Sequence, residues 1–351
     1  MAYGVRLIPR QTPKAPDNFE AMMDIDLEGL DGYVARPYAG TDDHDALARL
    51  LNRWNQATSM PEVVTRSDID NSYANLENCD PETDMVLVDA PDGSLAGYTR
   101  IQWGDVATEP TRYWVVPHID PDHRETPLAM RLTEAGIARS AGIAENREAP
   151  RGRVLEGYAD RDNEPDIYSM YEKLGFHPAT FGASMVMSLE GDLPDATLPD
   201  GLAIRPVTEE HLRSIWEAHN EAFRDHWGYV EPTEKDWQWF LGFPHLDLDL
   251  WRVAWDGNEI AGQVRSFIND EENRTLGRRR GYTEFISTAR EWRKQGVASA
   301  LICASLRALR DRGMNEAALG VHAENPNGAY ELYQKLGFEV ENEWVTFHRE
   351  F

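Results

Sequence analysis

Hydrophobic and polar positions alternate along the chain in a pattern that predicts helices and strands in turn. The segments DALARLLNRW (45–54) and HLRSIWEAHNEAF (211–223) have apolar residues at helical spacing, and a short strand ending in Arg-Pro precedes each. Two β-rich runs joined by Asp-Gly follow each helix, which indicates a hairpin. A further strand, a long helix, a strand, a shorter helix and closing strands complete the order. This alternation predicts the α/β class with a mixed sheet.

The same order of elements occurs twice because the sequence itself repeats. Four segments recur in one order at nearly one spacing: DGYVARP (31–37) with DGLAIRP (200–206), SLAGYTR (94–100) with EIAGQVR (259–265), PDHRETPLA (121–129) with EWRKQGVA (291–298), and YEKLGF (171–176) with YQKLGF (333–338). Four ordered matches are not chance, and we infer a tandem duplication.

The limits of the two copies follow from this repeat. The segment LEGDLPDATLPDG (189–201) is rich in Pro, Asp and Gly, which indicates a linker. We expect an N-terminal extension at 1–30, a first domain at 31–190, a linker at 191–200 and a second domain at 201–351. A length of 351 residues suits two domains of about 150 residues each.

Both closing hexamers predict the C-terminus of a helix. Gly175 and Gly337 supply the left-handed residue, and the phenylalanine that follows each glycine packs back onto the last turn. The helix 297–313 is predicted to stop in the same way at Gly313. The two tyrosines at the front of the hexamers, Tyr171 and Tyr333, are either buried rings or groups that face a cleft.

Composition limits the classes of function. The net charge is −26, which disfavours nucleic acid and anionic lipid as partners and is compatible with a cationic small molecule, although solubility alone explains an acidic surface. No run approaches the roughly 20 apolar residues of a membrane span. Two cysteines, Cys79 and Cys303, form neither a disulfide framework nor a closed zinc site, so we expect a cytoplasmic protein without a metal.

The strongest chemical signal is TEFISTAREWRKQGVASAL (283–301). A β-rich run breaks into a basic turn that opens a helix, so unpaired amides lie at the positive end of a helix dipole. Such a turn suits a pyrophosphate, and the small residues Gly296 and Ala298 allow a close approach to the backbone. Taken alone, an R-x-x-G-x-A pattern is weak evidence, because many helices begin after a basic turn.

The motif R-x-x-G-x-A after a strand, followed about 30 residues later by ENPNGAYELYQKLGF, resembles the GNAT acetyltransferase superfamily. The resemblance covers both copies and is more specific in the second. The tandem arrangement is similar to that of mycothiol synthase and its relatives. The resemblance implies two tandem GNAT-like acyl-CoA N-acyltransferase domains, each with a splayed mixed sheet, and acetyl-CoA as the cosubstrate.

The resemblance also implies roles for individual residues. Tyr333 would donate a proton to the departing thiolate. The residues implied to contact the cosubstrate are Ile286, Ser287 and Thr288 on the strand, Arg293, Lys294, Gln295, Gly296, Val297 and Ala298 in the loop, and Asn325 on the opposite side.

The general base is less clearly marked. The glutamate that is usual in this superfamily is replaced by Tyr282, and the acid of the strand is Glu284, two residues on. Residues i and i+2 share a face of a strand, so Glu284 can point into the same cleft. An ion-paired or solvated strand glutamate is an equal alternative.

The acceptor region of the second copy is AFRDHWGYVEPTEKDWQWF (222–240). Trp227 and Tyr229, with Tyr282, are candidate substrate-binding residues. Trp237 and Trp239 could line the same pocket, although an aromatic cluster of this kind more often packs a helix against a sheet. His226 is an acceptor-site residue or, as we prefer, a surface histidine.

The first copy lacks the residues that suit its loop to a pyrophosphate. Pro127 stands where the second copy has Gly296, and Glu125 where it has Lys294, so we expect no CoA at the first loop. Tyr171 then has only a packing role.

The favoured hypothesis is an N-acetyltransferase in which an amine of a small molecule attacks acetyl-CoA directly at the C-terminal domain. Cys303 lies within a helix pattern, which argues against an acyl-cysteine intermediate. The alternatives are a CoA-binding sensor or scaffold without catalysis, and an interaction protein that does not bind CoA. A monomer or a homodimer is compatible with two fused copies.

Overall fold

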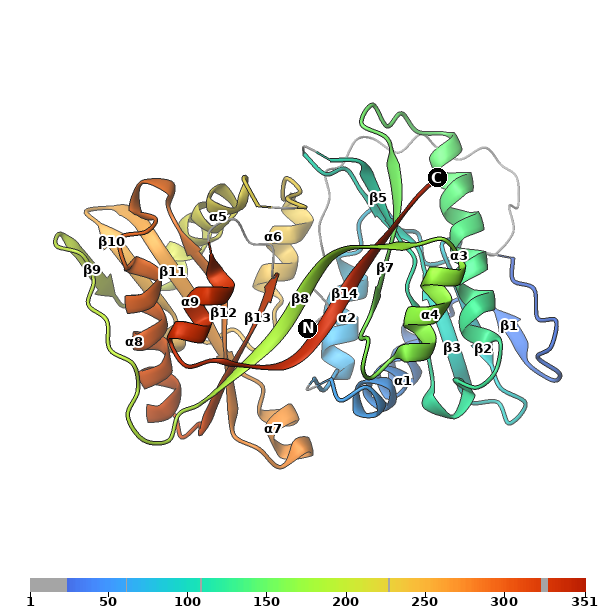
Figure 1. Ribbon diagram of the computed structural model, residues 1–351, viewed down its shortest axis with the longest axis horizontal. Coiled ribbons are helices and arrows are strands. Elements are labelled where there is room, and N and C mark those ends of the chain that lie inside the picture. Colours follow the sequence, from blue (N-terminus) through green and yellow to red (C-terminus); the bar gives the residue numbers. More distant parts are fainter. Residues whose placement is uncertain (1–23, 61, 108, 227, 323–327) are drawn as a thin grey trace. The chain divides into compact units, whose positions relative to one another are not determined.

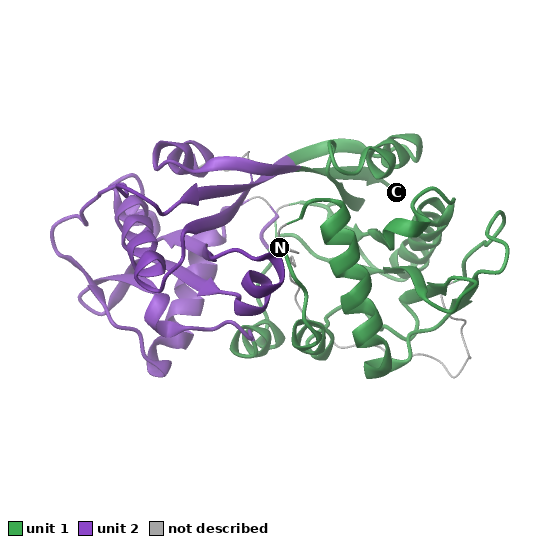
Figure 2. Cartoon of the chain, turned by 90° about the horizontal axis from the view of Figure 1, so that it is seen from below, with its two compact units in different colours: residues 1–180, 230–242, 344–351 green, residues 181–229, 243–343 purple. Residues whose placement is uncertain are grey.

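The computed structural model describes residues 24–60, 62–107, 109–226, 228–322 and 328–351. The chain divides into two compact units (Figure 2). Unit 1 comprises residues 1–180, 230–242 and 344–351, and unit 2 comprises residues 181–229 and 243–343. None of the helices within the described ranges has the length and apolar character needed to cross a membrane.

Unit 1 is a mixed α/β structure (Figure 1). Strands β1 (Val34–Arg36), β2 (Met85–Asp89), β3 (Leu95–Arg100) and β6 (Pro117–Ile119) form an antiparallel sheet in that order. Strand β4 (Gln102–Gly104) pairs antiparallel with β5 (Thr111–Trp114), which pairs parallel with β7 (Arg153–Ala159). Its helices are α1 (His44–Ala57), α2 (Arg66–Ala74), α3 (Leu128–Glu145), α4 (Pro165–Lys173) and α6 (Glu234–Leu241).

Unit 2 has the same class of structure. Its strands are β9 (Leu202–Arg205), β10 (Arg252–Asp256), β11 (Glu259–Ile268), β12 (Arg280–Thr288) and β13 (Glu316–His322). Only the β12–β13 pair among these described strands is parallel. Its helices are α5 (Leu212–Phe223), α7 (Asp270–Leu276), α8 (Val297–Asp311) and α9 (Ala329–Lys335). The α/β class with a mixed sheet, predicted from the alternation of elements, is confirmed.

Two long strands pass from one unit to the other. Strand β8 (His177–Ser188) begins in unit 1, but its residues from Gly182 onward pair antiparallel with β13 in unit 2. Strand β14 (Glu339–Glu350) begins in unit 2 and pairs antiparallel with β7 in unit 1 from Val345 onward. Each unit therefore contains most of one sequence copy and is completed by a strand that belongs to the other copy.

The register of the strands supports the duplication. Gly97 pairs with Ile119 in unit 1, and Gly262 pairs with Thr288 in unit 2. A Cβ at Gly97 would lie 3.1 Å from Leu132 in α3, and one at Gly262 would lie 3.3 Å from Leu301 in α8. Both glycines thus allow the helix after the loop to approach the third strand closely.

The two hexamers end helices as predicted. Gly175 and Gly337 have φ values of 81° and 99°, in the left-handed region. The amide of Phe176 donates to the carbonyl of Tyr171, and the amide of Phe338 donates to the carbonyl of Tyr333, which closes the last turn of α4 and α9. Both phenylalanine side chains are buried. The predicted Asp-Gly turns likewise join β2 to β3 and β10 to β11.

Candidate active site

The candidate site lies in unit 2, where strands β12 and β13 diverge. Their parallel pairing runs from Arg280 opposite Glu316 to Tyr282 opposite Ala318. Beyond that point β12 continues along β11 as far as Thr288, while β13 continues along β8 as far as His322. The two strands thus form a fork. Within the described residues, the part of β12 after Tyr282 no longer pairs with β13, so the edge of β12 that faces β13 has no neighbouring strand there.

A bulge in β12 lies just inside the fork. Glu284 pairs with Arg265 and Ser287 with Gln263, so Phe285 and Ile286 together face one residue of β11. Phe285 has a φ of 51°, which is uncommon for a residue with a large side chain. The guanidinium of Arg265 lies 4.2 Å from the centroid of the Phe285 ring, and this contact helps to hold the unusual conformation. The bulge changes the direction of the backbone before the residues predicted to face the cosubstrate.

Glu284 fills the fork. Its side chain is buried, and its Oε1 accepts a hydrogen bond of 2.9 Å from the amide of Gly320 on β13. The carboxylate of Glu284 thus contacts β13 in the region where β13 no longer pairs with β12. Gly320 could not have been identified from the sequence, because the contact depends on where the two strands separate.

Tyr333 lies close to this carboxylate. The residue belongs to α9 and is 6% exposed, and its ring packs edge-on against Phe338. Burial raises the pKa of the Tyr333 phenol, and the charge of Glu284 raises it further. The phenol therefore keeps its proton at neutral pH. The two predicted catalytic residues are thus coupled electrostatically within unit 2.

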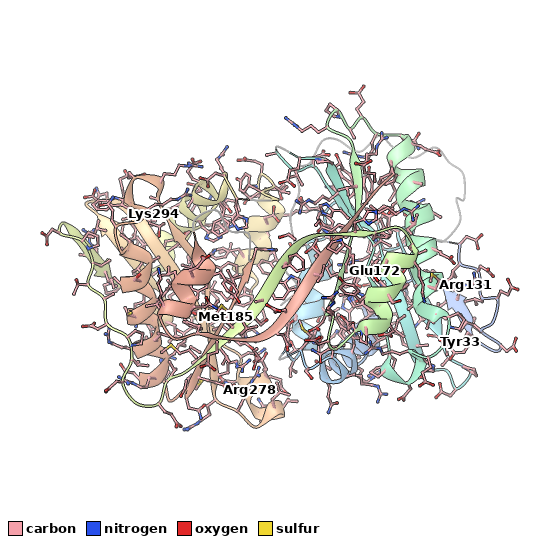
Figure 3. The ribbon with its side chains drawn as sticks, viewed as in Figure 1. Tyr33, Arg131, Glu172, Met185, Arg278 and Lys294 are labelled. Atoms are coloured by element: carbon pink, nitrogen blue, oxygen red, sulfur yellow. The ribbon has the colours of Figure 1, made fainter. Side chains whose placement is uncertain are left out.

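The loop before α8 presents unpaired amides. Lys294 and Gly296 have φ values of 60° and 89°, and the amides of residues 294–299 donate no main-chain hydrogen bond within the described ranges. A Cβ placed on Gly296 would meet no atom within 4 Å. Lys294 itself is exposed (Figure 3). This arrangement fits a bound pyrophosphate, because amide groups, a helix dipole and a cation converge on open space.

Arg293 is used differently from the other loop residues. Its guanidinium pairs with Asp225 at 2.5 Å and donates to the carbonyl of Ala222 at 2.6 Å. The side chain therefore fixes the loop to the end of α5. Asp225 was not singled out in the sequence, although an acid just after a helix facing a basic loop was a usable signal. Gln295 similarly donates to the carbonyl of Glu291.

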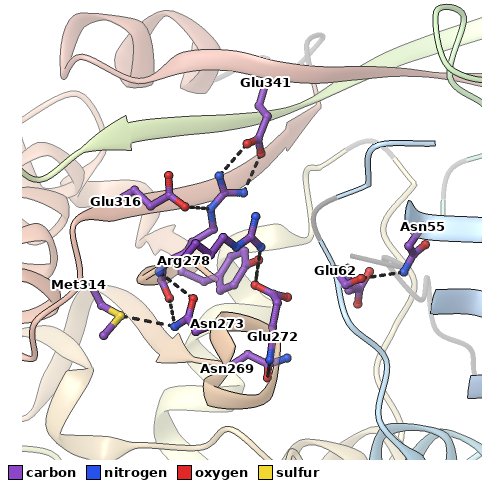
Figure 4. Close-up of polar contacts among 11 residues, drawn as sticks. Asn55, Glu62, Asn269, Glu272, Asn273, Arg278, Met314, Glu316 and Glu341 are labelled. Atoms are coloured by element: carbon purple, nitrogen blue, oxygen red, sulfur yellow. Dashed lines mark hydrogen bonds and ion pairs between the residues drawn. The ribbon is translucent and has the colours of Figure 1, made fainter. Parts of the chain in front are cut away.

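Tyr282 is held away from the fork by an ionic cluster. Its phenol donates to Glu272 at 2.5 Å, and its ring stacks on Phe267. Arg278 pairs with the same carboxylate at 2.6 Å (Figure 4). Burial and the charge of Glu272 raise the pKa of Tyr282. Helix α7, which carries Glu272, was not predicted.

The remaining candidates are placed as follows. The amide of Tyr229 donates to the carbonyl of His226, and the ring of His226 lies 5.9 Å from that of His322 at the end of β13. His226 is half-buried, so both the acceptor-site role and the surface position stay predictions. Trp227 and Asn325 lie outside the described residues. Within those residues no group of three or more His, Cys, Asp or Glu side chains could hold a metal ion.

A comparison with protein families identifies the class of one part of the chain. Residues 212–338 match the model of the acetyltransferase (GNAT) family. This segment is a GNAT domain. The match begins with α5 and ends at Phe338, so it contains the fork, the loop and α9.

Curated relatives extend the likeness beyond this domain to most of the chain. The mycothiol acetyltransferase of Acidothermus cellulolyticus is 27% identical over 283 residues, which cover 76% of this chain and 79% of the relative. The mycothiol acetyltransferase of Salinispora arenicola is 28% identical over 270 residues, which cover 75% and 81% of the two chains.

Solved structures share the fold. A GCN5-related N-acetyltransferase from Sphaerobacter thermophilus superposes with a TM-score of 0.68 at 23% identity, over 91% of this chain and 96% of that one. A tandem GNAT protein from the clavulanic acid biosynthesis pathway gives a TM-score of 0.62 at 15% identity, over 91% and 98%.

The first GNAT-like copy is closed at the equivalent place. Val115 occupies the position of Glu284 in the repeat, and the phenol of Tyr171 donates to the Val115 carbonyl at 2.8 Å. Tyr171 is fully buried, and a Cβ on Gly157 would lie 2.4 Å from its ring. The prediction that Tyr171 has a packing role is confirmed.

The loop of the first copy is covered by the chain itself. A Cβ on Gly29 would lie 3.5 Å from the ring of Pro127, and Leu30 is buried in the same core as Leu128. Arg131, in the first turn of α3, pairs with Asp26 at 3.0 Å (Figure 3). The segment 24–30 therefore lies over the part of unit 1 that corresponds to the open loop of unit 2.

Helix α6 belongs to unit 1. The side chain of Asn71 donates to the carbonyl of Trp239, and Lys235 donates to the carbonyl of Leu76. Trp237 and Trp239 are thus in unit 1, whereas Glu284 and Tyr333 are in unit 2.

Proposed function

We propose that this GNAT protein is an acetyl-CoA-dependent N-acetyltransferase that acts on a primary amine of a small molecule, and that unit 2 carries out the reaction. The observation that carries the proposal is the buried carboxylate of Glu284 in the fork, bonded to Gly320 and acting on the phenol of Tyr333, in the same unit as a loop with unpaired amides. We further propose a cytoplasmic enzyme that works as a monomer or a homodimer.

Acetyl-CoA supplies the activated acetyl group as a thioester. In the proposal the loop from Lys294 to Ala298 holds the pyrophosphate through main-chain amides, and the side chain of Arg293 keeps the loop in place through Asp225. Ile286, Ser287 and Thr288 offer the released edge of β12 to the pantetheine arm. Their geometry fits an extended ligand, because a strand edge without a neighbour can add one more strand.

Glu284 and Tyr333 then divide the proton transfers. The neutral amine attacks the carbonyl carbon of the thioester, a C–N bond forms, and Glu284 accepts a proton from nitrogen directly or through a water. The C–S bond breaks as Tyr333 gives its proton to sulfur. The proton on Glu284 then passes to water, and water returns a proton to the Tyr333 phenolate, so both groups regain their starting states.

The acceptor is proposed to be a small amine. Tyr229 and His226 lie in unit 2 with the fork and are candidates for its recognition, whereas the phenol of Tyr282 is engaged by Glu272. An acceptor related to mycothiol comes first in a test panel, because the curated relatives carry that name. Amino sugars, polyamines and peptide N-termini complete the panel.

The proposal is tested in two steps. Calorimetric titration of the full chain with acetyl-CoA should give one site per chain, and thiol release should then depend on an amine from the panel. Binding without any amine-dependent thiol release would favour a CoA sensor or scaffold. Absence of binding would contradict the enzyme itself, and two sites per chain would contradict the assignment to unit 2 alone.

A further inference from the structure

A cluster of aromatic and cationic groups in unit 1 has no part in the proposed reaction. Arg100 ends β3, and its guanidinium lies 4.8 Å from the centroid of the Tyr73 ring. Tyr98, two residues earlier on the same face of the strand, packs in the core formed with α1 and α2. Arg100, Tyr73 and Tyr98 are therefore on the side of the sheet that those two helices cover.

Arg100 differs from most of the buried and half-buried arginines of unit 1. Arg36, Arg112, Arg124, Arg131, Arg139 and Arg147 each form an ion pair with a carboxylate. Arg153 and Arg349 form none either, but each donates to a main-chain carbonyl, whereas the contacts of Arg100 among the described residues are with the phenol and the ring of Tyr73. A half-buried cation without a counter-ion is costly, and it is unexpected in a protein with a net charge of −26.

The carboxylates that act electrostatically on this cluster make no direct ion pair with Arg100 among the described residues. Asp43 acts on Tyr73 and is paired with Arg36, whereas Asp84 and Asp80 act on Cys79 and Asp84 is paired with Arg139. The charge of Arg100 therefore remains available for a partner that is not part of the chain described here.

The groups beside Arg100 are neutral. His118 stacks on Tyr98 with ring centroids 4.6 Å apart, and its Nδ1 is buried without a hydrogen-bond partner among the described residues. Burial and the charge of Arg100 lower the pKa of His118 to about 3. Burial raises the pKa of Cys79 to about 12, so its thiol keeps its proton. The cluster thus combines one cation with neutral polar and aromatic groups.

The sequence repeat places this cluster on the face that carries the reacting groups in unit 2. Arg100 corresponds to Arg265, which stands opposite Glu284, and the pair of Tyr98 with His118 has the register of Gln263 with Ser287. The first copy has lost its loop and its counterpart of Glu284, but it retains the arginine on this face.

We propose that Arg100, Tyr73 and His118 form a binding site in unit 1 for a small organic anion. A carboxylate or phosphate group pairs with the guanidinium, which offers several N–H donors in one plane. The apolar body of the ligand packs against the rings beside the guanidinium, those of Tyr73 and His118. This site is independent of the acetyl transfer proposed for unit 2.

Cys79 provides a local probe of occupancy. The charge of Arg100 acts on its thiol, and the other cysteine, Cys303, is fully buried in α8 and serves as the internal control. The experiment measures the rate at which iodoacetamide modifies Cys79 in the full chain at about pH 9, where more thiolate is present. The added compounds are benzoate, phenyl phosphate, and the uncharged isostere benzamide.

Benzoate or phenyl phosphate should protect Cys79, and benzamide should not. With a Kd of about 1 mM, about 10 mM of the anion slows the modification roughly tenfold by mass action. Comparison of the two anions shows whether the site prefers a carboxylate or a phosphate. No protection by either anion, or equal protection by benzamide, overturns the proposal.

Variants at Arg100 and Arg161 test whether the protection of Cys79 depends on Arg100. Arg100→Gln should abolish it, Arg100→Lys should retain part of it, and Arg161→Gln, which removes an exposed arginine of the same unit, should leave it unchanged. Circular dichroism and a thermal melt verify that each variant is folded. Protection that persists in Arg100→Gln, or that is lost equally in Arg161→Gln, contradicts the assignment of the site.

Discussion

The phenol of Tyr171 donates a hydrogen bond of 2.8 Å to the main-chain carbonyl of Val115. In the second copy the corresponding positions are held by Tyr333 and Glu284, and there the phenol lies near a carboxylate. Carboxylates raise the pKa of both phenols, Glu164 for Tyr171 and Glu284 for Tyr333, but the phenol of Tyr171 is also held by a main-chain carbonyl. The difference arises from one position on the strand, where valine replaces glutamate.

Replacement of the two tyrosines should separate these roles. Tyr333→Phe should lower the rate of thiol release by about 10²-fold or more, because it removes a proton donor. Tyr171→Phe should leave the rate unchanged and lower the free energy of unfolding by about 1 to 3 kcal/mol, because a buried carbonyl loses its partner. Steady-state kinetics and denaturant unfolding measure the two effects. Equal kinetic losses in both variants would contradict this division.

Glu284→Gln should lower kcat by about 10²-fold while the chain remains folded. The amide oxygen of glutamine can still accept the hydrogen bond from Gly320, so the fork is preserved. The pH–rate profile should lose its acidic limb in this variant. Full activity with an unaltered profile would show that another group, or a chain of waters, removes the proton.

Replacement of Gly296 in the second loop should change acetyl-CoA binding, whereas replacement of Pro127 in the first loop should not. Gly296→Pro should abolish acetyl-CoA binding, because proline removes an amide and cannot adopt a φ of 89°. Gly296→Ala, with space for its Cβ, should weaken binding less. Pro127→Gly should leave the stoichiometry at one. Calorimetric titration measures all three, and a second site created by Pro127→Gly would show that the segment 24–30 does not close the first loop.

Glu156 in β7 should make unit 1 sensitive to acid. Burial opposes its ionisation, but hydrogen bonds from His348 and the charge of Arg112 outweigh burial and lower its pKa below the usual 4.5. Its stabilising effect is therefore present above pH 4.5 and is lost as the pH falls through the lowered pKa. Glu156→Gln should cost about 3 to 5 kcal/mol near pH 7 and reduce the acid dependence, as measured by urea unfolding between pH 3 and 7. An unchanged acid dependence would contradict this assignment.

Glu164 should have the opposite effect on stability. Burial raises its pKa to about 7, so the folded chain binds an extra proton between the unfolded value of 4.5 and about 7. The corresponding stability is complete below pH 4.5 and is lost as the pH rises through about 7. Glu164→Gln can keep the hydrogen bond from Trp54 and should be more stable than the parent at pH 8, by on the order of 1 to 3 kcal/mol. Thermal melts at pH 5 and pH 8 measure this, and a destabilised variant at pH 8 would contradict it.

Local patterns allowed much of the fold to be predicted from the sequence. The helices at 45–54 and 211–223, the Asp-Gly hairpins and the helix ends at Gly175 and Gly337 depend on neighbouring residues, and all are confirmed. The strand exchange could not be predicted. Because β8 and β14 come from two copies with similar patterns, each has the alternation needed to pair with either sheet.

The site was predictable only in part for the same reason. Sequence placed Glu284 on the strand and Gly296 in the loop, since both are local assignments. The carbonyl partner of Tyr171, the amide partner of Glu284 and the carboxylate partner of Arg293 are contacts made over long sequence distances. Such contacts depend on the packing of whole elements, which periodicity does not encode.

The exchange of β8 and β14 has a consequence for biosynthesis. When a ribosome has completed residues 31–190, β7 in unit 1 still lacks the neighbour that residues 345–350 supply. The nascent first copy then carries an open strand edge and the long strand β8, whose partner β13 has not yet been made. A stop codon placed in the linker would leave a fragment that pairs with itself or with a second fragment. The two units therefore mature together, after residues 344–350 have been released.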